Sequence, residues 1–246
     1  MPTPPADALV VGAAGALGAA VLEHALGCGG FAHVRALVTQ PLASTVRGFG
    51  ALGFDGFDRA PPALGATAWI VFDRERRANG REDAYFRPDP ATLAPLARWL
   101  RAGGVRRLVV VLPHAPGLLP KALEHGLASL DEQALAAIGF EHLVIVRPAQ
   151  DAAARGVGSW LQRLALGVLA QLRWMVPQRD LPVRPASVAA FAVRVAMELP
   201  QATPGTRVAP PALVWQASQP GDPIGLVRGW LATGAWPSSA PTRMRM

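Results

Sequence analysis

Short apolar runs alternate with amphipathic segments along roughly the first 150 residues of the chain. The first run, residues 8–11 (ALVV), lies between Asp7 and Gly12 and predicts a buried strand. Strands that are apolar along their whole length are typical of parallel sheets covered on both faces. Further strands of this kind are predicted at residues 33–38, 68–72, 106–112 and 142–146.

Apolar residues with helical spacing separate these strands. Residues 15–27 show this spacing and end at Gly27, and further helices are predicted over residues 90–102 and 120–138. The segment between residues 40 and 66 is rich in Gly, Pro and Ala and has room for one short strand. The alternation predicts an α/β fold: a Rossmann-like, doubly wound parallel sheet with right-handed crossovers.

The pattern changes after about residue 150. We interpret residues 151–236 as a small C-terminal extension of helices and a strand that could cap the carboxyl ends of the sheet, where such folds bind ligands. Together with the core at residues 8–150 it makes one domain, residues 1–236, followed by a disordered tail at 237–246. Within the extension, helices are predicted at 157–174, 186–199 and 222–232, and a strand at 207–215.

Composition narrows the class of protein. The 246 residues are 51% hydrophobic and 17% charged, which excludes a chain that is disordered throughout. The net charge is +7, but Lys121 is the only lysine and the arginines are spread along the whole chain. We therefore favour a diffuse basic surface over a specific nucleic-acid site. No long uncharged apolar run and no signal-peptide pattern are present, so we expect a cytoplasmic protein without a membrane span.

Metal and thiol chemistry have little support in the sequence. Cys28 is the only cysteine, so a disulfide framework or a cysteine-based zinc site is excluded. His24, His33, His125 and His142 show no metal-ligand spacing. We predict no metal site.

The most informative segment joins the first strand to the first helix and reads VVGAAGALG. We expect Gly12 to make the tight turn, Gly15 to let the backbone approach a pyrophosphate, and Gly18 to bring the helix close to the sheet. The free N–H groups at the start of the helix would then bind the phosphates. The alternative is a plain tight turn of small packing residues.

The residue that follows the second strand usually distinguishes NAD from NADP. An acid there bonds the ribose 2′-hydroxyl of NAD, whereas an arginine accepts the 2′-phosphate of NADP. This chain has Thr39 and Gln40, which we place near the adenosine ribose. The absence of an acid gives a slight preference for NADP over NAD.

Three segments resemble the atypical short-chain dehydrogenase/reductase group, and within it the Tat-interacting-protein-like and NmrA-like branches. They are residues 10–18 with the helix that follows, residues 102–111 (AGGVRRLVVV) and residues 139–148 (GFEHLVIVRP). The resemblance implies an NAD(P)-binding oxidoreductase with its substrate over the strand ends, and it implies that Pro148 and Ala149 lie near the nicotinamide. The pyrophosphate is expected against Gly12, Ala13, Ala14, Gly15, Ala16, Leu17 and Gly18.

The chain departs from this group at the catalytic residues. The group's reductases use a tyrosine followed four residues later by a lysine that lowers the pKa of the phenol. The only tyrosine here is Tyr85 and the only lysine is Lys121, so this dyad is missing and we assign no catalytic residue. In addition, residues 73–77 (DRERR) put bulky charged side chains where relatives keep small residues, and they could crowd or replace the cofactor.

Two functions therefore stay open. The first is an NAD(P)-binding, oxidoreductase-like protein without the Tyr/Lys chemistry. The second is a non-catalytic scaffold that senses a dinucleotide or binds a protein. Either function is compatible with a homodimer.

Overall fold

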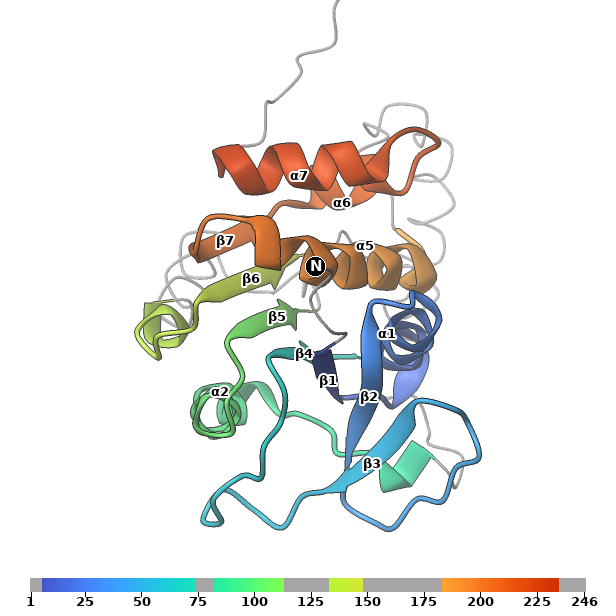
Figure 1. Ribbon diagram of the computed structural model, residues 1–246, viewed down its shortest axis with the longest axis vertical. Helices are drawn as coiled ribbons and strands as arrows, with labels where there is room; N and C mark the ends of the chain where they lie inside the picture. Colours follow the sequence, from blue (N-terminus) through green and yellow to red (C-terminus); the bar gives the residue numbers. More distant parts are fainter. Residues whose placement is uncertain (1–5, 74–81, 113–132, 148–182, 235–246) are drawn as a thin grey trace, which may run out of the picture.

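The computed structural model describes residues 6–73, 82–112, 133–147 and 183–234, which form a seven-stranded sheet covered by helices (Figure 1). The strand order is β3-β2-β1-β4-β5-β6-β7, and every neighbouring pair is parallel. The sheet is therefore the predicted Rossmann-like α/β sheet. The strands are β1 (Ala6–Val11), β2 (Phe31–Val38), β3 (Phe49–Gly53), β4 (Thr67–Val71), β5 (Arg107–Val111), β6 (His142–Val146) and β7 (Gly205–Ala209).

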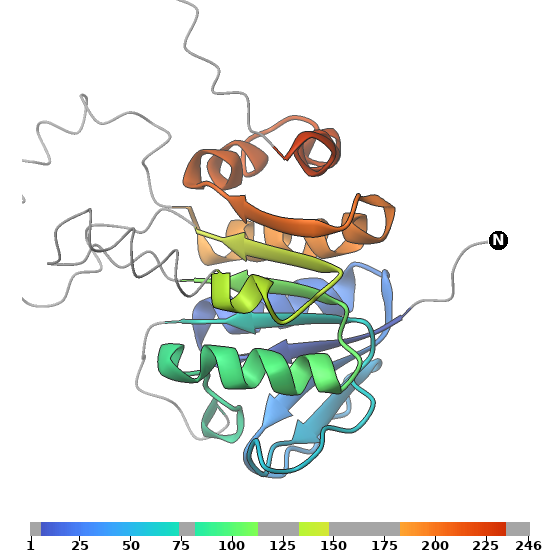
Figure 2. The same ribbon diagram turned by 90° about the vertical axis from the view of Figure 1, so that its left-hand side faces the viewer.

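Helices lie on both faces of the sheet (Figures 1 and 2). On one face, α1 (Gly15–Gly27) packs against α5 (Pro185–Glu198). The other face is covered by α2 (Leu93–Ala102), which packs against a different set of strand side chains from the one that α1 and α5 contact. Beyond α5 lie α6 (Pro211–Ala217) and α7 (Pro223–Thr233). The short 3₁₀ helices are η1 (Glu82–Ala84), η2 (Pro90–Thr92) and η6 (Leu199–Gln201).

Successive side chains of β1 point to opposite faces of the sheet and contribute to two separate core layers. Ala8 and Val10 pack with the residues of α1 and α5, whereas Leu9 and Val11 pack with those of α2. All four side chains are fully buried. Complete burial of a Val or Leu side chain is worth about 1.5–3 kcal/mol, which explains why residues 8–11 of the strand are all apolar.

The C-terminal part of the chain is joined to the sheet by Trp69. This fully buried side chain on β4 donates a hydrogen bond from Nε1 to the carbonyl oxygen of Ala192 on α5, at 3.2 Å. Its ring also meets Phe31 edge to face, with the ring centres 5.3 Å apart. The C-terminal part also pairs with the sheet directly, because β7 is its edge strand next to β6. Its described residues thus supply both an edge strand, β7, and a helix packed on the sheet, α5.

Several sequence predictions can be compared with these bounds. The helix predicted at 15–27 is α1, and the short strand in the 40–66 segment is β3. The predicted strand at 207–215 is wrong in its second half, because β7 ends at Ala209 and α6 begins at Pro211. Proline has no N–H for a strand ladder but suits the first turn of a helix.

Other predictions fall mainly outside the described residues. Only residues 133–136 of the helix predicted at 120–138 are described within a helix. The helix predicted at 157–174 and the tail at 237–246 lie wholly outside the described ranges.

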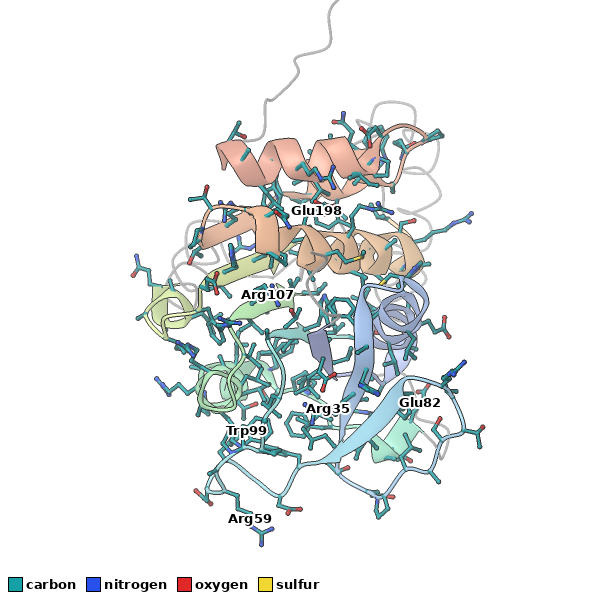
Figure 3. All side chains as sticks on the ribbon, viewed as in Figure 1. Arg35, Arg59, Glu82, Trp99, Arg107 and Glu198 are labelled. Carbon is teal, nitrogen blue, oxygen red and sulfur yellow. The ribbon has the colours of Figure 1, made fainter. Side chains whose placement is uncertain are left out.

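A polar cluster lies at the amino ends of the central strands. His142 is only 1% exposed, and its Nδ1 has no hydrogen-bond partner among the described residues. Its Nε2 lies 3.6 Å from Oε1 of Glu141. Beside it lies Arg107, which is labelled in Figure 3. Its Nε donates to the hydroxyl of Thr67 at 3.0 Å. Burial lowers the pKa of His142, the charges of Arg207 and Arg107 lower it further, and Glu141 opposes the shift.

We expect stability to fall as the pH is lowered from 7 to 5. The unfolded chain takes up a proton at His142 near pH 6.5, whereas the folded protein takes it up only at lower pH. The free energy of unfolding should therefore decline below about pH 6.5, by at most about 1.4 kcal/mol per pH unit for this one proton.

Denaturant unfolding at pH 7, 6 and 5 measures this slope. His142→Gln should make the slope shallower, whatever it does to stability at pH 7. The matched control is His24→Gln, at an exposed histidine on α1, which should keep the wild-type slope. Equal slopes in the wild type and His142→Gln would contradict the assignment.

Candidate functional site

The turn between β1 and α1 needs glycine at its first position. Gly12 has a φ of 84° and Gly15 a φ of 79°, a backbone conformation that L side chains rarely adopt. A Cβ on Gly12 would lie 2.1 Å from the carbonyl oxygen of Val71 on the neighbouring strand β4. The turn is therefore pressed against the end of β4.

Gly18 lets the helix begin close to this turn. A Cβ there would lie 1.9 Å from the carbonyl oxygen of Gly12. Only a residue without a side chain allows the first turn of α1 to pack this tightly. The turn lies where the strand order reverses, since β2 is on one side of β1 and β4 is on the other. In open α/β sheets, ligands bind in the crevice at this point.

The first turn of α1 has no acceptor of its own for its free N–H groups. Ala14 at the N-cap makes no side-chain hydrogen bond, and no acidic residue lies in the first turn. The acceptor comes from Asp73, two residues beyond the end of β4, whose Oδ2 accepts from the N–H of Leu17 at 2.7 Å. A Cβ on Gly15 would lie only 2.6 Å from the same oxygen. The carboxylate of Asp73 therefore lies over the backbone where a pyrophosphate is expected.

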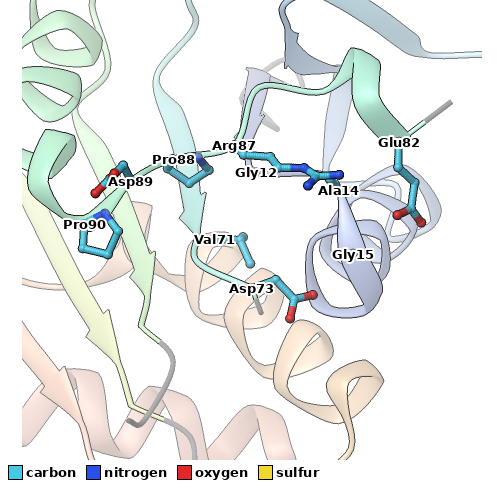
Figure 4. A pocket seen from close by; sticks show the side chains of 10 residues that line it. All are labelled: Gly12, Ala14, Gly15, Val71, Asp73, Glu82, Arg87, Pro88, Asp89 and Pro90. Carbon is cyan, nitrogen blue, oxygen red and sulfur yellow. The ribbon is translucent and has the colours of Figure 1, made fainter. Parts of the chain in front are cut away.

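A cavity of about 360 Å³ opens beside this carboxylate (Figure 4). Three of the side chains around it are carboxylates, from Asp73, Glu82 and Asp89, and one is a guanidinium, from Arg87. The Arg87 side chain extends toward Ala14 at the start of α1 (Figure 4). The described residues that line the cavity are Gly12, Ala14, Gly15, Val71, Asp73, Glu82, Arg87, Pro88, Asp89 and Pro90.

The wall that carries Glu82, Arg87 and Asp89 is held by backbone bonds to the end of β2. The N–H of Thr39 donates to the carbonyl of Ala84 at 2.8 Å, and the N–H of Phe86 donates to the carbonyl of Leu37 at 2.9 Å. At the far end of this wall, the Asp89 side chain accepts from the N–H of Ala91 at 2.8 Å and begins η2.

An ion pair limits the charge that Arg87 offers to a ligand. Its Nη2 lies 3.5 Å from Oδ1 of Asp83. The described lining of the cavity is thus more acidic than basic, although the chain as a whole carries a charge of +7.

The structure brings together only part of the predicted site. Of the turn residues, Gly12, Ala14 and Gly15 line the cavity. Leu17 contributes its N–H, as described above. The others lie around the turn without lining the cavity, Ala13 and Gly18 buried and Ala16 exposed.

The residues predicted near the two ends of a dinucleotide are outside the cavity or outside the described ranges. Thr39 and Gln40 are exposed at the end of β2, and the Thr39 hydroxyl donates to the carbonyl of Ala84 at 3.4 Å. Pro148 and Ala149 lie outside the described residues.

Sequence reasoning missed the wall residues Glu82, Arg87 and Asp89. The segment EDAYFRPDP has the composition of a solvated loop. Its one available signal was Asp89 followed by Pro90, which is a helix-start pattern. That pattern predicts η2 but says nothing about the β1–α1 turn.

The described ranges hold neither a candidate metal centre nor a candidate membrane span. No group of three or more His, Cys, Asp or Glu side chains there could hold a metal ion. Nor does any helix in that part of the chain have the length and apolar character needed to cross a membrane.

No protein-family model matches the sequence, and no curated protein matches it. Solved structures with some similarity include a candidate epimerase from Bacteroides thetaiotaomicron, which is 20% identical, with 59% of this chain and 71% of that chain covered and a TM-score of 0.40. A candidate exported protein from Burkholderia pseudomallei is 20% identical, with 58% and 72% covered and a TM-score of 0.37. The Bordetella bronchiseptica enzyme WbmG, in complex with NAD, is 16% identical, with 85% and 83% covered and a TM-score of 0.38. These similarities are too distant to assign a function.

We expect Asp73→Ala to lower the free energy of unfolding by about 1 kcal/mol, because the N–H of Leu17 loses its acceptor. For a chain of this size that loss lowers Tm by about 2–4 °C. The matched control is Asp222→Ala at the start of α7, where the carboxylate accepts from the N–H groups of Ile224 and Gly225. Thermal melts should show similar losses for the two variants, and a loss confined to Asp222→Ala would show that Asp73 does not cap α1.

Proposed function

We propose that this chain is an NAD(P)-binding, oxidoreductase-like protein that binds the dinucleotide in the cavity beside the β1–α1 turn. The observation that supports this most directly is the glycine turn at the point where the strand order reverses. A Cβ at Gly12 or Gly18 would collide with backbone, and an anionic oxygen, that of the Asp73 carboxylate, lies over Gly15. This combination is what a pyrophosphate needs: close backbone and free N–H groups.

The residues present fit such a ligand on one condition. The N–H groups of the first turn of α1 would hold the pyrophosphate, and Arg87 would supply a positive charge from the opposite wall. The Asp73 side chain would have to turn away, because it occupies that position in the structure. Thr39 and Gln40 would lie toward the adenosine ribose, and Pro148 and Ala149 toward the nicotinamide. NADP stays slightly preferred over NAD.

Proton transfer by a Tyr/Lys pair is not part of this proposal. The segment that carries Tyr85 bridges to Val38 at the end of β2, on the side of β1 away from β5 and β6. In this type of sheet the nicotinamide half of a dinucleotide lies on the β5 and β6 side. The bound cofactor itself would supply a hydride.

A second candidate function is supported by Asp73. A carboxylate in the phosphate position, with Glu82 and Asp89 nearby, favours a scaffold that keeps the fold without using the nucleotide. The chain would then act through protein contacts. It would be cytoplasmic under either candidate function.

Thermal shift with NADPH and NADH separates the two candidates. Binding at about 100 times Kd should stabilise the protein by about 2.7 kcal/mol. Arg87→Ala should weaken binding by about 10- to 150-fold, because a hydrogen bond to a charged group is worth about 1.5–3 kcal/mol. Arg98→Ala, at an exposed arginine on α2, is the matched control and should bind as the wild type does.

Each outcome of the thermal-shift experiment supports a different interpretation. A shift that Arg87→Ala reduces and Arg98→Ala does not would support binding in this cavity. A shift that is equal in all three proteins would place the nucleotide elsewhere. If neither nucleotide gives a shift at millimolar concentration, the scaffold is favoured.

A further inference from the structure

Helix α1 is capped in a different way from α7. At α7 the cap is local: Asp222 immediately precedes the helix and its Oδ1 accepts from the N–H groups of Ile224 and Gly225, at 3.1 and 2.9 Å. At α1 the acceptor is Asp73, which is 56 residues away in the sequence from Leu17. A local cap belongs to the turn that starts its helix, whereas Asp73, two residues beyond the end of β4, belongs to a different part of the chain.

The Asp73 carboxylate takes the contacts that a phosphate would take. One oxygen accepts from the N–H of Leu17, and the carboxylate carbon would lie 3.0 Å from a Cβ on Gly15. Both a carboxylate and a phosphate satisfy free N–H groups and complement the positive end of the helix dipole. The two groups therefore cannot occupy this position together.

Charge makes this competition stronger than a simple overlap in space. After turning away, Asp73 would remain at the edge of the same cavity, together with Glu82 and Asp89. The one guanidinium lining the described part of the cavity, from Arg87, is shared with Asp83. Like charges a few ångströms apart in a partly enclosed site repel by several times their energy in bulk water.

We propose that Asp73 is an internal competitor for phosphate and determines the affinity of this cavity for phosphate-bearing ligands. The inference rests on the proposed function, because it concerns the pyrophosphate position of the same site. The free protein keeps the start of α1 satisfied by its own carboxylate. A dinucleotide binds only by displacing that carboxylate.

The test compares the wild type with Asp73→Asn by calorimetry. Asparagine keeps an oxygen acceptor for the N–H of Leu17 and removes the charge, so the fold should be retained. The matched control is Asp222→Asn, which makes the same change at the cap of α7. The probes are NADP⁺, NAD⁺ and inorganic pyrophosphate, each at low salt and at 150 mM salt.

We expect Asp73→Asn to bind NADP⁺ and pyrophosphate about tenfold more tightly than the wild type or more, with the larger gain at low salt, because a unit charge beside the ligand is removed. Asp222→Asn should leave every affinity unchanged. Asp73→Ala provides a second variant, which removes the competing side chain altogether. It should bind at least as tightly as Asp73→Asn.

The measurements distinguish an error in the proposed competition between Asp73 and phosphate from an error in the proposed dinucleotide-binding function. If the wild type and both Asp73 variants bind NADP⁺ equally well, the dinucleotide site stands and Asp73 does not compete. If the Asp73 variants bind pyrophosphate but no protein binds NADP⁺ or NAD⁺, the competition stands and the dinucleotide function is wrong. If no protein binds any probe, both are wrong.

Discussion

The free N–H groups at the start of α1 are the constraint around which this end of the molecule is arranged. The helix begins only three residues after β1, because Gly12 and Gly18 have no side chains to block the approach. That close packing leaves no residue of the first turn to accept the N–H groups. The N–H groups are therefore open to an acceptor from elsewhere in the chain, from water or from a ligand, and for Leu17 the acceptor is Asp73.

Because the strands are parallel, all their amino ends lie at one edge of the sheet and all their carboxyl ends at the other, and the two edges carry different groups. At the carboxyl ends, the chain leaving β4 meets the start of α1 and forms the cavity. At the amino ends, polar groups are enclosed instead of exposed: Arg107 bonds to Thr67, and His142 is buried beside Glu141. We therefore expect protonation at the amino end to affect stability, and the position of the Asp73 side chain at the carboxyl end to affect binding.

The sequence predicted the parts of the fold that depend on local pattern. Uniformly apolar runs identified the central strands, and the glycine spacing located the β1–α1 turn with its steric roles. It did not predict the course of the chain around Pro210 and Pro211, where an apolar run continues from a strand into a helix. The charges from Asp73 onward predict a segment that can crowd a cofactor. Its contact with Leu17 depends on β1 and β4 being neighbours, which no local pattern shows.

The cavity also shows why the net charge of a chain is a poor guide to its ligand. Charges more than about 8 Å away are largely screened at physiological salt. A phosphate at the start of α1 would therefore respond to Asp73, Glu82 and Arg87 far more than to arginines spread over the rest of the surface. The overall charge of +7 favours anions, but the side chains around the β1–α1 turn do not. If the proposed function is right, a few residues at the end of β4 and in the segment bonded to the end of β2 would decide the affinity for a nucleotide.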